Sequence, residues 1–372
     1  MKSIINRLFF SWILKLKKFL APVLIVAFGI YLSSPIWRYK DFFRGNDLIS
    51  NISSFVYYSD ALHKFGKIPE WNYYLGLGLP TYADPLNSFF SPIIFIFFMV
   101  FNFYTATKLL LITSIICAGL SSYYLFRYFK ISKTVSVLTS LTYMTSGYLA
   151  GRLVAGHLEK IIAYFLIPFF YYVFFSLINT KKIRYGILLG LIQSLFLLSA
   201  SMYELYYSFL IESIYFLYIF IQVISRNSSY KELLNGFYLI LVATIVFIST
   251  SFFKLVPMIQ YSKDSARNVD PFLGSQTLIS IFYSFFYPIT NKISELPNAL
   301  SSIPFRFWEY YAYIGPLPFF AIVYFLCSIN RIKLKHKIFI IFTLFFLYMY
   351  SMIDSICQVP ISLNGLSKSL FI

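Results

Sequence analysis

The chain has 372 residues, of which 59% are hydrophobic, 22% are aromatic and only 12% are charged, and its formal net charge is +17. A soluble domain carries about 25% charged residues, so this chain has too few to cover a surface that faces water. The composition therefore excludes a soluble enzyme, a disordered chain and a secreted scaffold held by disulfides.

Apolar runs recur along the sequence at about the 20 residues needed to cross a ~30 Å hydrocarbon core, and they predict an all-α polytopic membrane protein. We expect one transmembrane domain over residues 1–372 with about nine transmembrane helices. The run 88–101 is short and contains Pro92, which is typical of a re-entrant or interfacial segment. The expected spans lie near residues 19–36, 105–126, 134–151, 161–178, 185–200, 205–225, 233–256, 310–329 and 337–353.

The basic residues predict sidedness, because cytoplasmic loops are enriched in Lys and Arg. If the run 88–101 does not cross, the N-terminus and the loops on its side hold 17 of the 31 basic residues, and 12 of the 14 acidic residues fall on the other side. This asymmetry predicts a multi-pass protein of the cytoplasmic (plasma) membrane with its N-terminus inside. The positive charge therefore indicates orientation in the lipid bilayer, and no nucleic acid partner is expected.

Two long segments, residues 37–104 and 257–309, interrupt the spans on the predicted outer side. Loops longer than ~12–15 residues are usually functional or disordered, and both segments are too rich in Trp, Tyr, Phe and Pro for disorder. We expect interfacial or re-entrant helices in the first segment. The cytoplasmic loops are too short for a nucleotide-binding fold, so any chemistry is expected on the outer side, with a substrate reached from the bilayer.

The first outer loop offers a candidate catalytic acid and a group of aromatic residues. Asp47 would share a helix face with Asn51 and Ser54, and a carboxylate there could accept the proton of an acceptor hydroxyl. A helix-capping aspartate at the membrane edge is the alternative interpretation. Trp71 and Tyr74 fit either an interfacial aromatic belt or a platform on which a sugar stacks.

Several charged residues further along the chain are candidates for binding. His157 and Glu159 could ligate a divalent ion such as Mg²⁺ or Mn²⁺ or hold a head group, or they could be ordinary polar residues of a loop. Lys254 lies near the end of its span, where an intramembrane cation indicates a functional site unless it extends to the interface. Arg267 and Arg306 suit a lipid phosphate, because arginine binds phosphate in a bidentate manner.

A set of short segments follows one order between residues 40 and 325. They are Gly45-Asn-Asp47, Gly66-Lys-Ile-Pro-Glu-Trp-Asn72, Gly78-Leu-Pro80, Ser91-Pro92, Ala155-Gly-His157 with Pro168, Leu255-Val-Pro257, Ser265-Ala-Arg267 and Trp308-Glu-Tyr-Tyr-Ala-Tyr-Ile-Gly315. This ordered set resembles the YfhO-like bacterial membrane proteins of the GT-C glycosyltransferase superfamily. The chain departs from larger relatives by stopping soon after the ninth expected span.

The resemblance implies a GT-C-type helical bundle with a long helical first outer loop. It also implies a cell-envelope enzyme that moves a sugar from a polyprenyl-phosphate-linked donor to a glycan, lipid or protein acceptor on the outer face. Asp47 occupies the place of the superfamily's essential acidic residue. His157 and Glu159 occupy that of a second acidic or metal-binding group, but without an Asp-x-Asp pair, so metal dependence is left open.

Two further classes of function remain open. One is a transporter or flippase of a lipid-linked saccharide, and the other is a non-catalytic subunit of an envelope-polymer complex. Transporters commonly contain inverted repeats and charges near mid-bilayer, whereas this sequence shows no repeat and its acids collect on one side, which favours an outer-face enzyme. For that enzyme we predict Asp47 as catalytic base and a substrate site formed by Lys254, Arg267, Arg306, Glu309, Asp84, Trp71, Tyr74 and Trp308.

Overall fold

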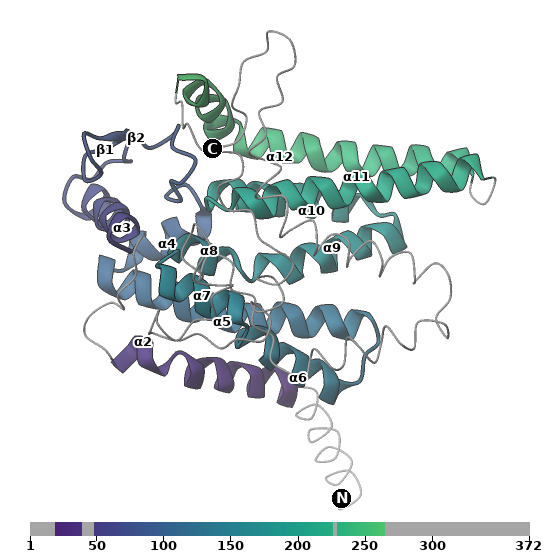
Figure 1. The fold of residues 1–372 in the computed structure, drawn as a ribbon, viewed down its shortest axis with the longest axis horizontal. Helices are drawn as coiled ribbons and strands as arrows, with labels where there is room; N and C mark the ends of the chain where they lie inside the picture. Colours follow the sequence, from purple (N-terminus) through teal and green to yellow (C-terminus); the bar gives the residue numbers. More distant parts are fainter. Residues whose placement is uncertain (1–18, 39–47, 226–228, 265–372) are drawn as a thin grey trace, which may run out of the picture. The chain divides into compact units, whose positions relative to one another are not determined.

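The computed structural model describes residues 19–38, 48–225 and 229–264 (Figure 1). It is mostly helical, at 79%, as the composition predicts. The chain divides into two compact units, residues 1–144 with 157–258 and residues 145–156 with 259–372. The expected spans 310–329 and 337–353, and the second long loop beyond residue 264, lie outside the described residues.

Four helical stretches of the described chain are long and apolar enough to cross a membrane: Phe103–Tyr128, Leu158–Thr180, Met202–Ile224 and Tyr230–Tyr261. Two shorter apolar helices, Phe19–Leu32 and Ile183–Leu198, occupy positions where the hydropathy also predicts spans. The helix Phe103–Tyr128 (α5) has 26 residues and is therefore about 39 Å long, more than the ~30 Å of a hydrocarbon core. The coarse prediction of a helical membrane protein is confirmed.

The expected single span 134–151 is wrong, because the chain forms two shorter helices there. Helix α6 covers Lys133–Met144, and α7 covers Gly147–Ala155. Ser146 caps α7, since its side-chain oxygen accepts a hydrogen bond from the Leu149 N–H at 3.3 Å. A serine that binds the first free N–H groups favours a new helix start, and hydropathy alone does not detect it.

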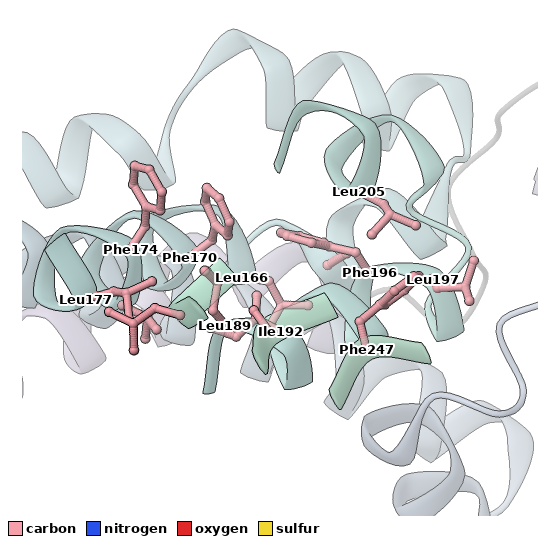
Figure 2. Packing of buried hydrophobic residues seen from close by; sticks show 14 residues of the cluster. Leu166, Phe170, Phe174, Leu177, Leu189, Ile192, Phe196, Leu197, Leu205 and Phe247 are labelled. Carbon is pink, nitrogen blue, oxygen red and sulfur yellow. The ribbon is translucent and has the colours of Figure 1, made fainter. Parts of the chain in front are cut away.

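Helices α8 (Leu158–Ala163), α9 (Leu166–Thr180), α10 (Ile183–Leu198) and α11 (Met202–Ile224) follow one another through short turns. Helices α8 and α9 together form the continuous stretch Leu158–Thr180, whereas the short turns before and after α10 make α9, α10 and α11 successive antiparallel neighbours. Figure 2 shows the apolar cluster that these helices and α12 (Tyr230–Asp264) form. Its labelled members are Leu166, Phe170, Phe174, Leu177, Leu189, Ile192, Phe196, Leu197, Leu205 and Phe247.

Small residues bring α10 and α12 into close contact. A Cβ added at Gly190 would lie 2.3 Å from the carbonyl oxygen of Ala243, and one at Gly186 would lie 3.0 Å from that of Leu239. One helical turn beyond Gly190, the Oγ of Ser194 lies 2.5 Å from the Oγ1 of Thr250. Glycines four residues apart let two backbones approach, which is a common basis of helix association in membranes.

Helix α5 is the centre of the other half of the same unit, where it packs against α3, α4, α6, α8 and α9. Gly119 of α5 is again a point of close approach. A Cβ there would meet the Sδ of Met144 at 2.2 Å and the Cγ2 of Ile25 at 2.7 Å. The helix Phe19–Leu32, which precedes α2 (Ser34–Arg38), therefore packs beside α5 and α6.

The segment before α5 folds as two helices and a small ribbon. Helix α3 covers Leu48–His63, strands β1 (Trp71–Asn72) and β2 (Leu79–Pro80) pair antiparallel, and α4 covers Pro92–Val100. With nine residues, α4 is about 14 Å long, less than half of a hydrocarbon core. This length agrees with the expectation that the run 88–101 does not cross by itself.

Candidate functional site

The loop between β2 and α4, residues 80–91, is turned by its own polar side chains, and we call it the Asp84 loop. The Oδ1 of Asp84 accepts a hydrogen bond from the Leu86 N–H at 2.9 Å, and the Oδ1 of Asn87 accepts one from the Phe89 N–H at 3.0 Å. Asp and Asn favour such turns because their short side chains reach the backbone two residues on. These two hydrogen bonds set the backbone conformation of the loop from within the loop itself.

Lys254 of α12 reaches this loop from the far end of the described chain. Its side chain is completely buried, and its ammonium donates a hydrogen bond to the carbonyl oxygen of Asn87. The neighbouring Phe253 packs edge-on against Phe90, with ring centroids 5.5 Å apart, and Phe90 stacks on Tyr82 at 4.4 Å. Helix α12 therefore holds the Asp84 loop by the contact of Lys254 with Asn87 and by the contacts of Phe253 with Phe90 and Tyr82.

Asp84 itself lies in a partly buried position beside this contact. Burial raises the pKa of the Asp84 carboxyl above its ordinary value. The hydrogen bond from Leu86 and the positive charge of Lys254 act in the opposite direction and offset only part of the effect. A carboxyl whose pKa is shifted by burial beside a cation is one feature of groups that act in acid–base chemistry.

A second charged pair lies next to the same loop. Lys160 of α8 forms an ion pair with Glu204 of α11 at 3.2 Å, and both side chains are about nine-tenths buried. The Lys160 ammonium also donates to the carbonyl oxygen of Ala200 at 3.3 Å, in the turn between α10 and α11. In that turn, the Ser199 hydroxyl donates to the Ser91 hydroxyl at 2.8 Å, which connects the pair to the Asp84 loop.

The structure therefore brings together polar residues that are widely separated in the sequence. We call Asp84, Lys254, Lys160 and Glu204 the charged cluster. They form two pairs, Asp84 beside Lys254 and Lys160 with Glu204, and the turn 199–201 connects the second pair to the Asp84 loop through Ser91. Buried charges need partners, because taking an ion out of water costs several kcal/mol. Each cation of this cluster has a partner, so the cluster is a stable feature of this end of the bundle.

The two aromatic candidates lie on the ribbon side of α3. The Tyr74 hydroxyl donates to the Oδ2 of Asp60 at 2.8 Å, and the Tyr57 hydroxyl donates to the carbonyl oxygen of Trp71. Trp71 and Tyr74 are each 42% exposed. Their rings are thus held in place but open on one side. This arrangement suits both earlier interpretations, an interfacial belt and a stacking platform.

The proposed metal ligands stand in a different environment. His157 immediately precedes α8 and is partly buried, and Glu159 in the first turn of α8 is 8% exposed. Within residues 19–38, 48–225 and 229–264, no three His, Cys, Asp or Glu side chains come together as metal ligands. His157 and Glu159 would therefore need further ligands from elsewhere in the chain or from substrate. A metal site here stays a prediction.

Five of the predicted site residues, Asp47, Arg267, Arg306, Trp308 and Glu309, lie outside the described residues, and their roles stay predictions. Sequence reasoning did not identify Lys160, Asn87 or Ser199 as part of a site. Lys160 offered a signal, because a lysine beside an apolar helix has to find a partner. Asn87 and Ser199 offered none, since Asn87 binds Lys254 through its backbone carbonyl and the partner of the Ser199 hydroxyl, Ser91, is 108 residues away in the sequence.

A cavity of about 330 Å³ lies near the opposite ends of α9 and α11. Its walls are mainly apolar, and the ion pair between Lys181 and Glu232, at 2.9 Å, lies at its edge. The volume is within the range of small-molecule sites. It is separate from the charged cluster, because Lys181 follows the last residue of α9 whereas Lys160 lies before its first.

Comparisons of the chain with protein-family models, with curated proteins and with solved structures gave no match. The resemblance to YfhO-like proteins therefore rests on the ordered sequence segments alone.

Proposed function

We propose that the chain is a membrane glycosyltransferase of the GT-C type, which moves a sugar from a polyprenyl-phosphate-linked donor to an acceptor on the outer face of the cytoplasmic membrane. The observation that carries the proposal is the charged cluster at one end of a bundle of apolar helices. A reaction at a lipid phosphate needs charged groups at the bilayer edge rather than in a soluble domain. The predicted orientation of the acidic residues places the same end outside.

The reaction assigned to this site breaks the bond between the anomeric carbon and the carrier phosphate oxygen. The phosphate leaves with the bonding electrons, the acceptor oxygen forms the new bond to the anomeric carbon, and Asp47 takes the acceptor proton. Arg267 and Arg306 neutralise the charge that develops on the phosphate, and stabilising such charge is often the largest catalytic contribution. Asp47 directly precedes α3, the helix that supports the Trp71–Tyr74 ribbon.

In this proposal Lys254 is a positioning residue. Its ammonium is buried against Asn87, so in this structure it holds the Asp84 loop. Trp71, Tyr74 and Trp308 bound the sugar, and Asp84 and Glu309 bind its hydroxyl groups. His157 and Glu159 are second-rank candidates for a divalent metal ion or for the carrier head group.

The test uses the purified full chain in liposomes that contain a polyprenyl-phosphate hexose labelled in the sugar, together with an envelope glycan acceptor. We expect Asp47→Asn to lower transfer at least 100-fold, because general base catalysis contributes about 10²–10⁴-fold. Glu70→Gln is the matched control, since it makes the same kind of change in the same loop at an exposed acid. Full transfer by the Asp47→Asn variant would remove Asp47 from this role.

One observation favours the rival transporter: a carboxylic side chain, Glu212, is buried within the bundle and is 3% exposed. Acidic residues inside a membrane often mark ion or substrate paths. The same liposomes distinguish the two functions. A transporter would move labelled lipid-linked saccharide between leaflets and leave the sugar on its carrier, whereas the enzyme would place label on the acceptor.

A further inference from the structure

Glu212 forms a polar contact between α11 and α10 inside the apolar core. The Gln193 side chain donates a hydrogen bond from its Nε2 to the Oε1 of Glu212 at 2.7 Å. Gln193 is completely buried and Glu212 is 3% exposed. Ile192, which precedes Gln193, belongs to the apolar cluster of Figure 2. This contact lies among hydrocarbon side chains and apart from the charged cluster.

Within the described part of the chain, the side-chain oxygen of Gln193 lacks a hydrogen-bond donor. Its Oε1 is buried and accepts no hydrogen bond from any residue that the structure describes. The Ser208 hydroxyl accepts a hydrogen bond from the Gln193 Nε2 at 3.4 Å, and its own proton is donated to the carbonyl oxygen of Leu205 at 2.6 Å. A buried carbonyl oxygen without a donor is costly, and native proteins rarely keep one.

The Glu212 carboxylate, in turn, lacks a positive charge in the described ranges that would compensate its own negative charge. An ionised carboxylate in a hydrocarbon environment needs a cation or several hydrogen bonds. Among the residues that the structure describes, Glu212 forms no ion pair, and its carboxyl accepts a hydrogen bond from the Gln193 amide. One hydrogen bond from a neutral amide does not compensate for a full negative charge.

A single proton meets both requirements, and we infer that Glu212 and Gln193 form a proton-binding site in the core of the bundle. Glu212 carries the proton on one carboxyl oxygen and donates it to the Oε1 of Gln193. Its other oxygen accepts the Nε2–H of Gln193, so the acid and the amide form a closed pair of hydrogen bonds between α10 and α11. Loss of the proton would break one of these bonds and leave a charge in the core.

This site is independent of the proposed sugar transfer. It binds a proton whether or not the charged cluster is catalytic, and it couples the presence of that proton to the packing of α11 on α10. Hydrogen bonds between helices hold membrane bundles together, because lipid provides no competing partner for them. We therefore expect the protonated pair to be the state in which α10 and α11 are packed as described here.

Infrared difference spectroscopy of the full chain in lipid bilayers at neutral pH tests the inference. We expect the carbonyl stretching band of a protonated carboxylic acid in the wild type, and its loss in Glu212→Gln. Gln193→Leu should move the band to higher frequency, because the carboxyl then loses its amide partner. Glu204→Gln is the matched control on the same helix, since Glu204 is paired with Lys160 and should not contribute to the band. An unchanged band in Glu212→Gln would overturn the inference.

Thermal unfolding provides a second, independent measurement. Glutamine has the shape of a protonated glutamate and can both donate to and accept from the Gln193 amide, so Glu212→Gln should unfold at the wild-type temperature. Glu212→Ala should unfold at a lower temperature, because it removes both hydrogen bonds and leaves a cavity. If Glu212→Gln is destabilised as much as Glu212→Ala, the negative charge is required and the proton-binding site is refuted.

Discussion

Lys254 shows how a charged residue is accommodated in an otherwise apolar helix. The carbonyl oxygen of Asn87 and the nearby Asp84 carboxyl offset part of the cost of burying the Lys254 ammonium. The sequence identifies Lys254 as unusual, because a charged lysine within an apolar span is costly to bury unless it has a partner. It does not identify the partner, since the partner is a backbone atom whose position depends on the turns at Asp84 and Asn87.

The burial of Asp84 makes a prediction about pH. Because burial raises its pKa in the folded protein above the ordinary 3.8, the folded protein binds this proton more tightly than the unfolded protein does. The contribution of Asp84 to the free energy of unfolding is therefore greatest below pH 3.8 and is lost as the pH rises through the raised pKa. We expect Asp84→Asn to flatten this part of the stability curve, as measured by thermal unfolding over a pH series.

The matched control for this measurement is Glu70→Gln, at an exposed acid ahead of β1. The stability of the Glu70→Gln variant should depend on pH in the same way as that of the wild type. If the stability of Asp84→Asn changes with pH as steeply as that of the wild type, Asp84 does not titrate differently in the folded and unfolded states.

At the scale of helices, α10 and α12 can approach closely because Gly186 and Gly190 of α10 have no side chain. Alanine normally stabilises a helix relative to glycine by about 0.5–1 kcal/mol. At Gly190 we expect the opposite, a loss of about 1–3 kcal/mol, because a Cβ 2.3 Å from the carbonyl oxygen of Ala243 would push the two backbones apart. Thermal unfolding of Gly190→Ala in detergent measures the effect.

Gly236→Ala is the control, because it makes the same substitution on α12 at a position with more room. A Cβ there would meet the Cδ1 of Ile219 at 3.3 Å, and that atom is the flexible end of a side chain. We expect this variant to be as stable as the wild type or more so. Equal destabilisation of the two variants would show that the glycines of α10 are not a packing interface.

The positions of the spanning helices could be predicted from the sequence, but their interruptions could not. Hydropathy located α5, α9, α11 and α12, because each is a long apolar run. It failed at residues 134–151, where α6 ends at Met144 and the cap formed by Ser146 starts α7. Gly186 and Gly190 show the four-residue spacing of a helix interface, yet the spacing does not reveal that the partner helix is α12.

At the scale of the whole molecule, the sequence predicted the class of protein from its composition and a reactive side from its charges. The described residues support the class and place four charged side chains at one end of the bundle. Asp47 and the arginines after residue 264, to which the proposed chemistry is assigned, lie outside the described residues. The ion pair of Lys160 with Glu204 was not predicted, because it joins residues 44 positions apart in the sequence.

The contact between Lys254 and Asn87 joins residues 167 positions apart, and this has a consequence for biosynthesis. The ribosome completes the Asp84 loop long before it makes α12, so the loop lacks this contact while helices α4 to α11 are synthesised. We expect nascent chains that end at Ser225 to be cut by protease within residues 80–91, and chains that have released α12 to resist cleavage there. Protection at the shorter length would contradict this order. The Asp84 loop would therefore take up its described position only after the synthesis of α12.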